Sequence, residues 1–229
     1  AQRMLSGMTL AAVIFGITLS TLHQSGLGAL FLMAKEKIHP LWYSEFIPLL
    51  FLVSSVFAGL SMVIFEGSIS NKVFSDQLTE KSHKEHNGIL HSLSGICAVA
   101  MFAYLFLQVL NFIHNKRWDY LNTPMGYWFL TEIIGFVILP MVLYFYSYRV
   151  KNITLIKVAA VLTMLGIILN RLNVSVIGFR WDAAVRYVPS WMEIVVTLSI
   201  IFIEIWIFRW IVTRMPVLRE SPAWARKEH

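Results

Sequence analysis

Six long runs of mostly apolar residues dominate the sequence and constrain its fold more than any other feature. A helix needs about 20 such residues to cross a bilayer. The runs lack the alternation of barrel strands, and helices are the other structure that satisfies the backbone in lipid. The sequence therefore predicts an all-α integral membrane protein with spans at about 5–34, 46–65, 89–113, 125–146, 153–177 and 192–212.

Only 14% of the 229 residues are charged, against about 25% in an average soluble protein. The net charge of +6 is spread over loops and tail, so it reports orientation rather than a nucleic-acid partner. We expect one transmembrane domain over residues 1–229, with a polar cytoplasmic loop at 67–88 and a cytoplasmic tail at 213–229. Further helices are expected before residue 1, because the chain opens without Met.

The basic residues outside the spans divide unequally between the two sides of the membrane. One side carries ten Lys and Arg residues and the other six, so the positive-inside rule places both termini in the cytoplasm. Tryptophans at the opposite ends of the spans are expected to form an interfacial belt: Trp42, Trp118, Trp128, Trp181 and Trp191.

Arg171 lies inside the fifth apolar run, in the triplet Asn170-Arg171-Leu172. An arginine at membrane depth costs about 2.5–3.5 kcal/mol on insertion scales, and its guanidinium cannot lose its proton. We therefore expect it to face a partner, a water-filled cavity or a ligand. A structural tie to Glu132 or Glu193 is the competing interpretation, because intramembrane charges commonly pair.

Other polar residues fall at a similar height, in the outer half of four different spans. Their types suit a ligand with a polar head and an apolar tail, such as a quinone, which needs hydrogen-bond donors and proton-exchanging groups. The predicted site consists of His23, Gln24, Glu132, Asn170, Arg171, Asn173, Tyr187, Trp191 and Glu193. Two acids nearer the inner side, Glu66 and Glu204, are candidates for a proton path. His23 as a plain inter-helix hydrogen-bonding residue and Glu66 as a boundary residue remain the alternatives.

The sequence predicts no haem, iron–sulfur cluster or metal on this chain. A membrane b-type haem usually takes two histidines at one depth, whereas His23, His39, His91 and His114 fall at different depths. The one cysteine, Cys97, cannot hold a cluster. Electrons would then come from a partner.

Several strings in this order resemble the HybB-like membrane subunits of the NrfD/polysulfide-reductase (PsrC) family. They are Thr21-Leu22-His23-Gln24-Ser25-Gly26, Ile38-His39-Pro40-Leu41-Trp42, Ile64-Phe65-Glu66-Gly67, Asn170-Arg171-Leu172, Val188-Pro189-Ser190-Trp191-Met192-Glu193 and Ile203-Glu204-Ile205. The resemblance implies about ten spans, of which these six would be the last. It also implies a subunit without cofactors of its own in a bacterial or archaeal cytoplasmic membrane, with His23, Arg171 and Glu193 as the catalytic quinone-site residues.

The resemblance further implies partners: an iron–sulfur ferredoxin-like subunit and a catalytic oxidoreductase subunit such as a hydrogenase or a multihaem cytochrome. We expect a quinone-interacting subunit that exchanges electrons with menaquinone or ubiquinone, with proton translocation as a coupled activity. A passive anchor without a quinone site is the alternative from another class. A transporter is disfavoured, because the spans show no paired broken helices.

Overall fold

The computed structural model describes residues 2–73, 80–182 and 189–214, and it contains no β-strand within these ranges. The chain divides into two units, Ala1–Ala184 and Val185–His229, and each is described by itself. Within the described ranges, six helices are long and apolar enough to cross a membrane: Val13–Leu32, Ile47–Val73, His86–His114, Pro124–Val150, Ile153–Ile177 and Trp191–Ile211. The predicted all-α membrane fold is confirmed.

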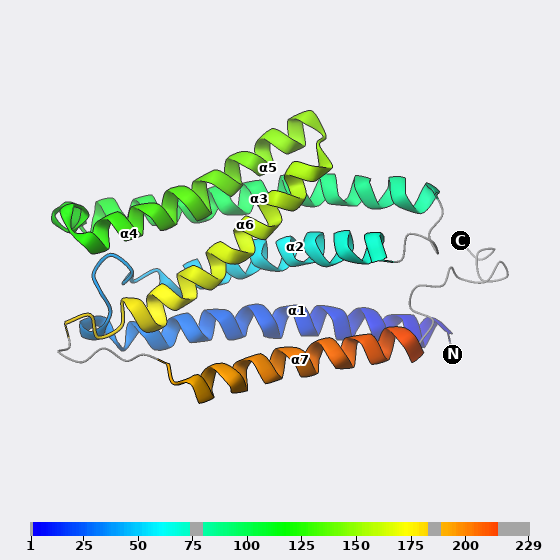
Figure 1. The fold of residues 1–229 in the computed structure, drawn as a ribbon, viewed down its shortest axis with the longest axis horizontal. Coiled ribbons are helices and arrows are strands. Elements are labelled where there is room, and N and C mark those ends of the chain that lie inside the picture. Colours follow the sequence, from blue (N-terminus) through cyan, green and yellow to red (C-terminus); the bar gives the residue numbers. More distant parts are fainter. Residues whose placement is uncertain (1, 74–79, 183–188, 215–229) are drawn as a thin grey trace. The chain divides into compact units, whose positions relative to one another are not determined.

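The first unit contains five of these spans (Figure 1). Their helices are α1 (Gln2–Leu32), α2 (Ile47–Val73), α3 (Glu80–His114), the pair α4 (Pro124–Ile133) and α5 (Leu139–Val150), and α6 (Ile153–Leu172). Helix α2 packs against α1, α3 and α6, while α5 packs against α3 and α6. Ile64, Met101, Tyr144 and Ile156 are almost fully buried between them. The second unit contains α7 (Trp191–Arg214).

The connector between the second and third spans is shorter than the sequence predicts. We expected a loop over 67–88, but α2 continues to Val73 and α3 begins at Glu80. Lys, Glu, Gln and His are compatible with helices, so a polar sequence on its own does not end one. Both helices therefore extend beyond their apolar segments.

Two π-helical turns interrupt the spans near the site described below. The turn η4 (Ile134–Ile138) precedes Pro140, which has no backbone N–H to donate and clashes with a preceding carbonyl. The turn η5 (Asn173–Ile177) follows α6 and ends at Gly178, whose N–H donates to the Asn173 carbonyl at 2.7 Å. A Cβ on Gly166 would lie 2.8 Å from Cβ of Phe136, so this glycine is what allows α6 to lie so close to η4.

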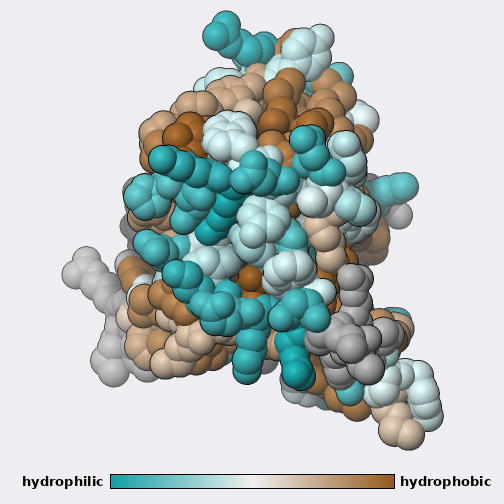
Figure 2. All heavy atoms as spheres, turned by 90° about the vertical axis from the view of Figure 1, so that its left-hand side faces the viewer, coloured by the Kyte–Doolittle hydropathy of each residue, from teal (hydrophilic) through white to brown (hydrophobic). Residues whose placement is uncertain are grey.

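One end of this unit is closed by a folded cap, which we define as the loop 33–46, the turn η3 (Arg117–Asn122) and residues 178–181. The His39 N–H donates to the Gly178 carbonyl at 2.8 Å, and Arg117 donates to the Tyr43 carbonyl. Hydrophilic side chains gather on this end (Figure 2). Trp42 is not part of an interfacial belt as predicted, because it is only 6% exposed and packs against Phe129 of the helix Pro124–Ile133.

His39 makes the cap sensitive to acid. Its side chain is 3% exposed, its Nδ1 accepts from the Leu41 N–H, and its ring contacts Trp42, Tyr120 and Trp181. Burial, and secondly the charge of Arg117, lower the pKa of His39 below its ordinary value of 6.5. In the unfolded chain His39 therefore becomes protonated near pH 6.5, whereas in the folded cap it becomes protonated only at a lower pH.

We expect the stability of the protein to fall as the pH drops below about 6.5, by at most about 1.4 kcal/mol per pH unit for this one proton. The variant His39→Asn keeps an acceptor for the Leu41 N–H but does not titrate. Thermal unfolding of both proteins between pH 7.5 and 5 measures the difference. An equal pH dependence in the variant would show that His39 is not the sensitive group.

Candidate functional site

Arg171 lies in the last turn of α6, in the half of the span Ile153–Ile177 that is next to the cap. Its Nη1 donates to Oδ1 of Asn170 at 3.1 Å and its Nη2 donates to Oγ of Ser54 at 2.7 Å. The guanidinium also lies over the ring of Phe51, with Cζ 3.5 Å from the ring centroid. Among the described residues, the polar partners of its side chain are thus an amide and a hydroxyl rather than a carboxylate.

Glu132 is the buried acid next to this arginine, at 3% exposure. Its Oε1 accepts from Nδ2 of Asn170 at 2.7 Å. Its Oε2 accepts from Nε1 of Trp42 at 2.7 Å and from Nδ2 of Asn173 at 2.6 Å. Three neutral donors from the cap, α6 and η5 therefore surround a carboxylate that α4 contributes.

The two asparagines of this network have fixed orientations. Oδ1 of Asn170 accepts from Arg171, and Oδ1 of Asn173 accepts from Nε1 of Trp128 at 3.0 Å. Each amide must therefore present its N–H₂ group to Glu132. As a result Asn170 bridges Glu132 and Arg171 through one hydrogen bond to each, and the two charged groups do not bond to each other directly. Asn170 thus takes the place of the direct tie to Glu132 that one version of the competing interpretation required, while the tie to Glu193, which lies in the second unit, stays an alternative.

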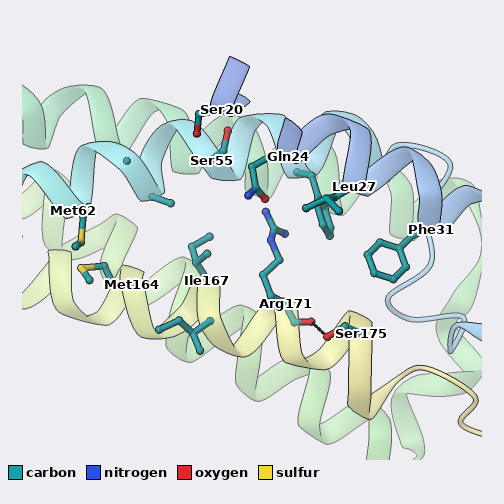
Figure 3. Close-up of a pocket in the computed structure, with 14 residues that line it drawn as sticks. Ser20, Gln24, Leu27, Phe31, Ser55, Met62, Met164, Ile167, Arg171 and Ser175 are labelled. Atoms are coloured by element: carbon teal, nitrogen blue, oxygen red, sulfur yellow. Dashed lines mark hydrogen bonds between the residues drawn. The ribbon is translucent and has the colours of Figure 1, made fainter. Parts of the chain in front are cut away.

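The guanidinium borders a groove of about 650 Å³, which we call the Arg171 groove. It is lined by Ser20, Gln24, Leu27, Phe31, Phe51, Ser55, Ala58, Gly59, Met62, Met164, Ile167, Ile168, Arg171 and Ser175. These residues come from α1, α2, α6 and η5. Figure 3 shows Gln24 and Arg171 pointing toward each other across it, from α1 and α6. The groove is thus mostly apolar, with its amide and its cation facing one another.

The structure brings together five of the predicted site residues: Gln24, Glu132, Asn170, Arg171 and Asn173. His23, their neighbour on α1, is exposed within the first unit and does not line the groove. Adjacent residues on a helix point about 100° apart, so His23 and Gln24 cannot both face it.

The other predicted residues lie elsewhere. Trp191 and Glu193 lie in the first turn of α7, in the second unit, and Glu204 lies further along the same helix. Tyr187 lies outside the described residues. Glu66 is exposed on α2.

Three residues that hold the site were missed: Ser54, Phe51 and Trp42. Ser54 looked like an ordinary small residue inside an apolar run. Trp42 was interpreted as interfacial because it lies between two spans. Their side-chain types are compatible with many other roles, so only the fold reveals that they meet Arg171 and Glu132.

Comparison with known proteins places this site within a family. The family model NrfD, described as polysulphide reductase, matches residues 1–180, which include the groove and all of the cap except Trp181. The chain belongs to the NrfD family. Family membership and the six candidate spans together make it a multi-pass membrane protein.

Three curated relatives support this membership. A protein of Nitratidesulfovibrio vulgaris strain Hildenborough is 46% identical across 94% of this chain and 56% of its own length. A probable Ni/Fe-hydrogenase 2 b-type cytochrome subunit of Escherichia coli K12 is 24% identical across 90% of this chain and 52% of its own length. A selenate reductase subunit of Mesobacillus selenatarsenatis is 31% identical across 69% of this chain and 37% of its own length.

The chain therefore spans about half the length of the first two of these relatives and less of the third. No solved structure matches it significantly.

Proposed function

We propose that this chain is the quinone-interacting part of a membrane subunit in a respiratory oxidoreductase complex. Two of its NrfD-family relatives are named as subunits of a hydrogenase and of a selenate reductase, which supports the assignment to such a complex. The quinone site itself is inferred from the Arg171 groove.

The observation that carries the proposal is a cation at the wall of an apolar groove, held by neutral partners. Arg171 uses one N–H on Asn170 and one on Ser54, so donors of its five-donor fork remain for a ligand. A quinone offers carbonyl oxygens to such donors, and its ring and isoprenoid tail suit the apolar lining. Gln24 on the facing helix supplies a second polar contact.

Quinone reduction adds two electrons and two protons, and the first charge develops on a carbonyl oxygen. A fixed guanidinium in an apolar environment stabilises that negative charge strongly, because few water molecules screen it. The protons must come from titratable groups. His23 and Glu193 as catalytic residues, and Glu66 and Glu204 as a proton path, remain predictions, and so does coupling to proton translocation.

The partners follow from the cap and the predicted orientation. We propose that the cap end faces the extracytoplasmic side, that both termini face the cytoplasm of a bacterial or archaeal cell, and that an iron–sulfur subunit delivers or accepts electrons at the polar cap (Figure 2). A hydrogenase or another catalytic oxidoreductase subunit would complete the electron path.

The absence of haem on this chain also remains a prediction. His39 lies between aromatic rings in the cap, and a ring nitrogen of His91, Nε2, lies 2.8 Å from the Tyr148 carbonyl oxygen. In His91 the ring nitrogen is therefore engaged by the backbone. The cytochrome in the name of the Escherichia coli relative is therefore not extended to this chain.

Filling the groove tests the proposal without touching Arg171. A Cβ on Gly59 would meet no atom within 4 Å, and Gly59 lines the groove, so Gly59→Leu is a way to add bulk to the groove. We expect the KM for a short-chain quinone to rise about tenfold, equivalent to about 1.4 kcal/mol of lost binding.

Gly135→Leu is the matched control, because Gly135 also has nothing within 4 Å of a Cβ but lies in η4, away from the groove lining. Its KM should stay unchanged. If both variants behave alike, the quinone does not use this groove, and the passive-anchor alternative is favoured.

A further inference from the structure

A second groove lies between α2 and α6 at the end of the first unit opposite the cap. It has a volume of about 620 Å³. Helix α2 lines it with Phe65, Ser68, Ile69, Asn71 and Lys72. Helix α6 adds Lys157 and Val161. We call it the lysine groove. None of its lining residues belongs to the Arg171 groove.

The lining residues form one face on each helix. Phe65, Ser68, Ile69 and Lys72 follow the spacing i, i+3, i+4, i+7 of a single helical face. Lys157 and Val161 are four residues apart on α6. The groove therefore runs along both helices. On α2, the apolar side chains of Phe65 and Ile69 come before Lys72, which lies near the end of the helix.

The two lysines give the groove a positive end without an acid. Lys157 lies inside the candidate span Ile153–Ile177, about one turn from its start, and Lys72 lies next to the last residue of α2. Both side chains are exposed, and none of the lining residues that the structure describes is acidic. Long basic side chains near a span end extend toward the level of the phosphates, so both ammonium groups reach the headgroup region.

A polar atom next to the lysines lacks a partner. Oδ1 of Asn71 is buried and accepts no hydrogen bond within the described part of the chain. A buried acceptor of this kind is costly, and a donor brought by a ligand would satisfy it. Ser68 is already engaged, because its hydroxyl donates to the Ile64 carbonyl at 2.6 Å.

We propose that the lysine groove binds an anionic phospholipid whose headgroup carries hydroxyls. The phosphate lies between the ammonium groups of Lys72 and Lys157, a headgroup hydroxyl donates to Asn71, and an acyl chain lies along Phe65, Ile69 and Val161. Free phosphate would use the lysines but not the apolar length of the groove. Basic pockets between spans are a common setting for anionic lipid headgroups. The site is separate from the proposed quinone chemistry.

Native mass spectrometry of the full-length protein in its complex tests this site. Wild type and the double variant Lys72→Gln/Lys157→Gln are each titrated with phosphatidylglycerol and with phosphatidylcholine. We expect wild type to retain phosphatidylglycerol at least tenfold more strongly than phosphatidylcholine, and the double variant to lose that preference. Lys72→Arg/Lys157→Arg should keep it, because the charges remain.

Lys151→Gln is the matched control, since Lys151 lies at the same end of the unit but outside the lysine groove. It removes one charge from the same end of the unit, as each substitution in the lysine groove does, and should leave the preference intact. The single variants Lys72→Gln and Lys157→Gln are measured beside this control. The proposal is overturned if the control loses as much binding as either of them, if wild type shows no headgroup preference, or if inorganic phosphate at equal concentration displaces the lipid. Quinone turnover should not follow lipid binding in these variants.

Discussion

Replacing Arg171 with leucine is expected to reduce quinone turnover by the intact complex about a hundredfold or more, while the complex still assembles. The loss of activity follows from removing the cation that, among the described residues, lines the groove, because a fixed donor at a developing negative charge is commonly worth that factor. Assembly should survive because Asn170 and Ser54, the polar partners of the guanidinium, are neutral. Their loss of a donor leaves no buried charge uncompensated.

Steady-state turnover with a quinone, together with the amount of assembled complex, measures both parts of this prediction. Arg149→Leu removes an exposed arginine near the end of α5 and should leave turnover unchanged. Arg171→Lys should be intermediate, because an ammonium keeps the charge but cannot reproduce the two-armed contact with Asn170 and Ser54. Normal turnover in assembled Arg171→Leu complex would remove the residue from the chemistry.

Replacing Glu132 with glutamine is expected to lower the stability of the protein, whereas Arg171→Leu is expected to lower its turnover. Glutamine offers one oxygen and an N–H₂ group, whereas the site holds three donors, from Trp42, Asn170 and Asn173. The asparagines cannot turn to present oxygens, because those oxygens already accept from Arg171 and Trp128. At least one buried donor therefore loses its partner and meets another donor, at a cost of about 1–3 kcal/mol.

For a chain of this size we expect the midpoint of thermal unfolding to fall by roughly 3–10 °C. Cys97 offers a readout within the first unit, since it is fully buried and is the one cysteine of the sequence. Its alkylation rate during heating reports when the core opens. Glu66→Gln, at an exposed position on α2, is the control. An unchanged midpoint in Glu132→Gln would contradict the three-donor network.

The two predictions separate two roles that the sequence could not distinguish. Arg171 and Glu132 both appear in the sequence as charges inside apolar runs, and such charges usually pair. The fold instead inserts Asn170 between them. The cation is then held at the groove, and the acid secures the cap, α4 and α6 to one another.

Much of the fold was predictable because hydropathy is a strong signal for spans. The six spans were correctly recognised from the lengths of their apolar runs. The π-helical turn at η5 was not predicted, because no proline lies in Asn173–Ile177 to indicate it. It continues directly from α6 and places Asn173 against Glu132.

The site was less predictable, because the depth of a residue does not determine the direction in which its side chain points. His23 and Gln24 lie at nearly the same depth, yet it is Gln24 that lines the groove. Lys157 is a lysine inside an apolar run, and its position in the sequence was enough to mark it as a candidate for a site such as the lysine groove. Its partner Lys72 became evident only when α2 and α6 were seen to pack together.

Photoaffinity labelling with a quinone that carries a photoreactive ring substituent tests the central claim most directly. After irradiation of the intact complex, peptide mapping identifies the labelled positions. The label is expected on peptides from α1, α2 and α6 that line the Arg171 groove, and Arg171→Leu should abolish it. Labelling confined to other helices, or labelling at the groove that persists in Arg171→Leu, would contradict a quinone bound by this guanidinium.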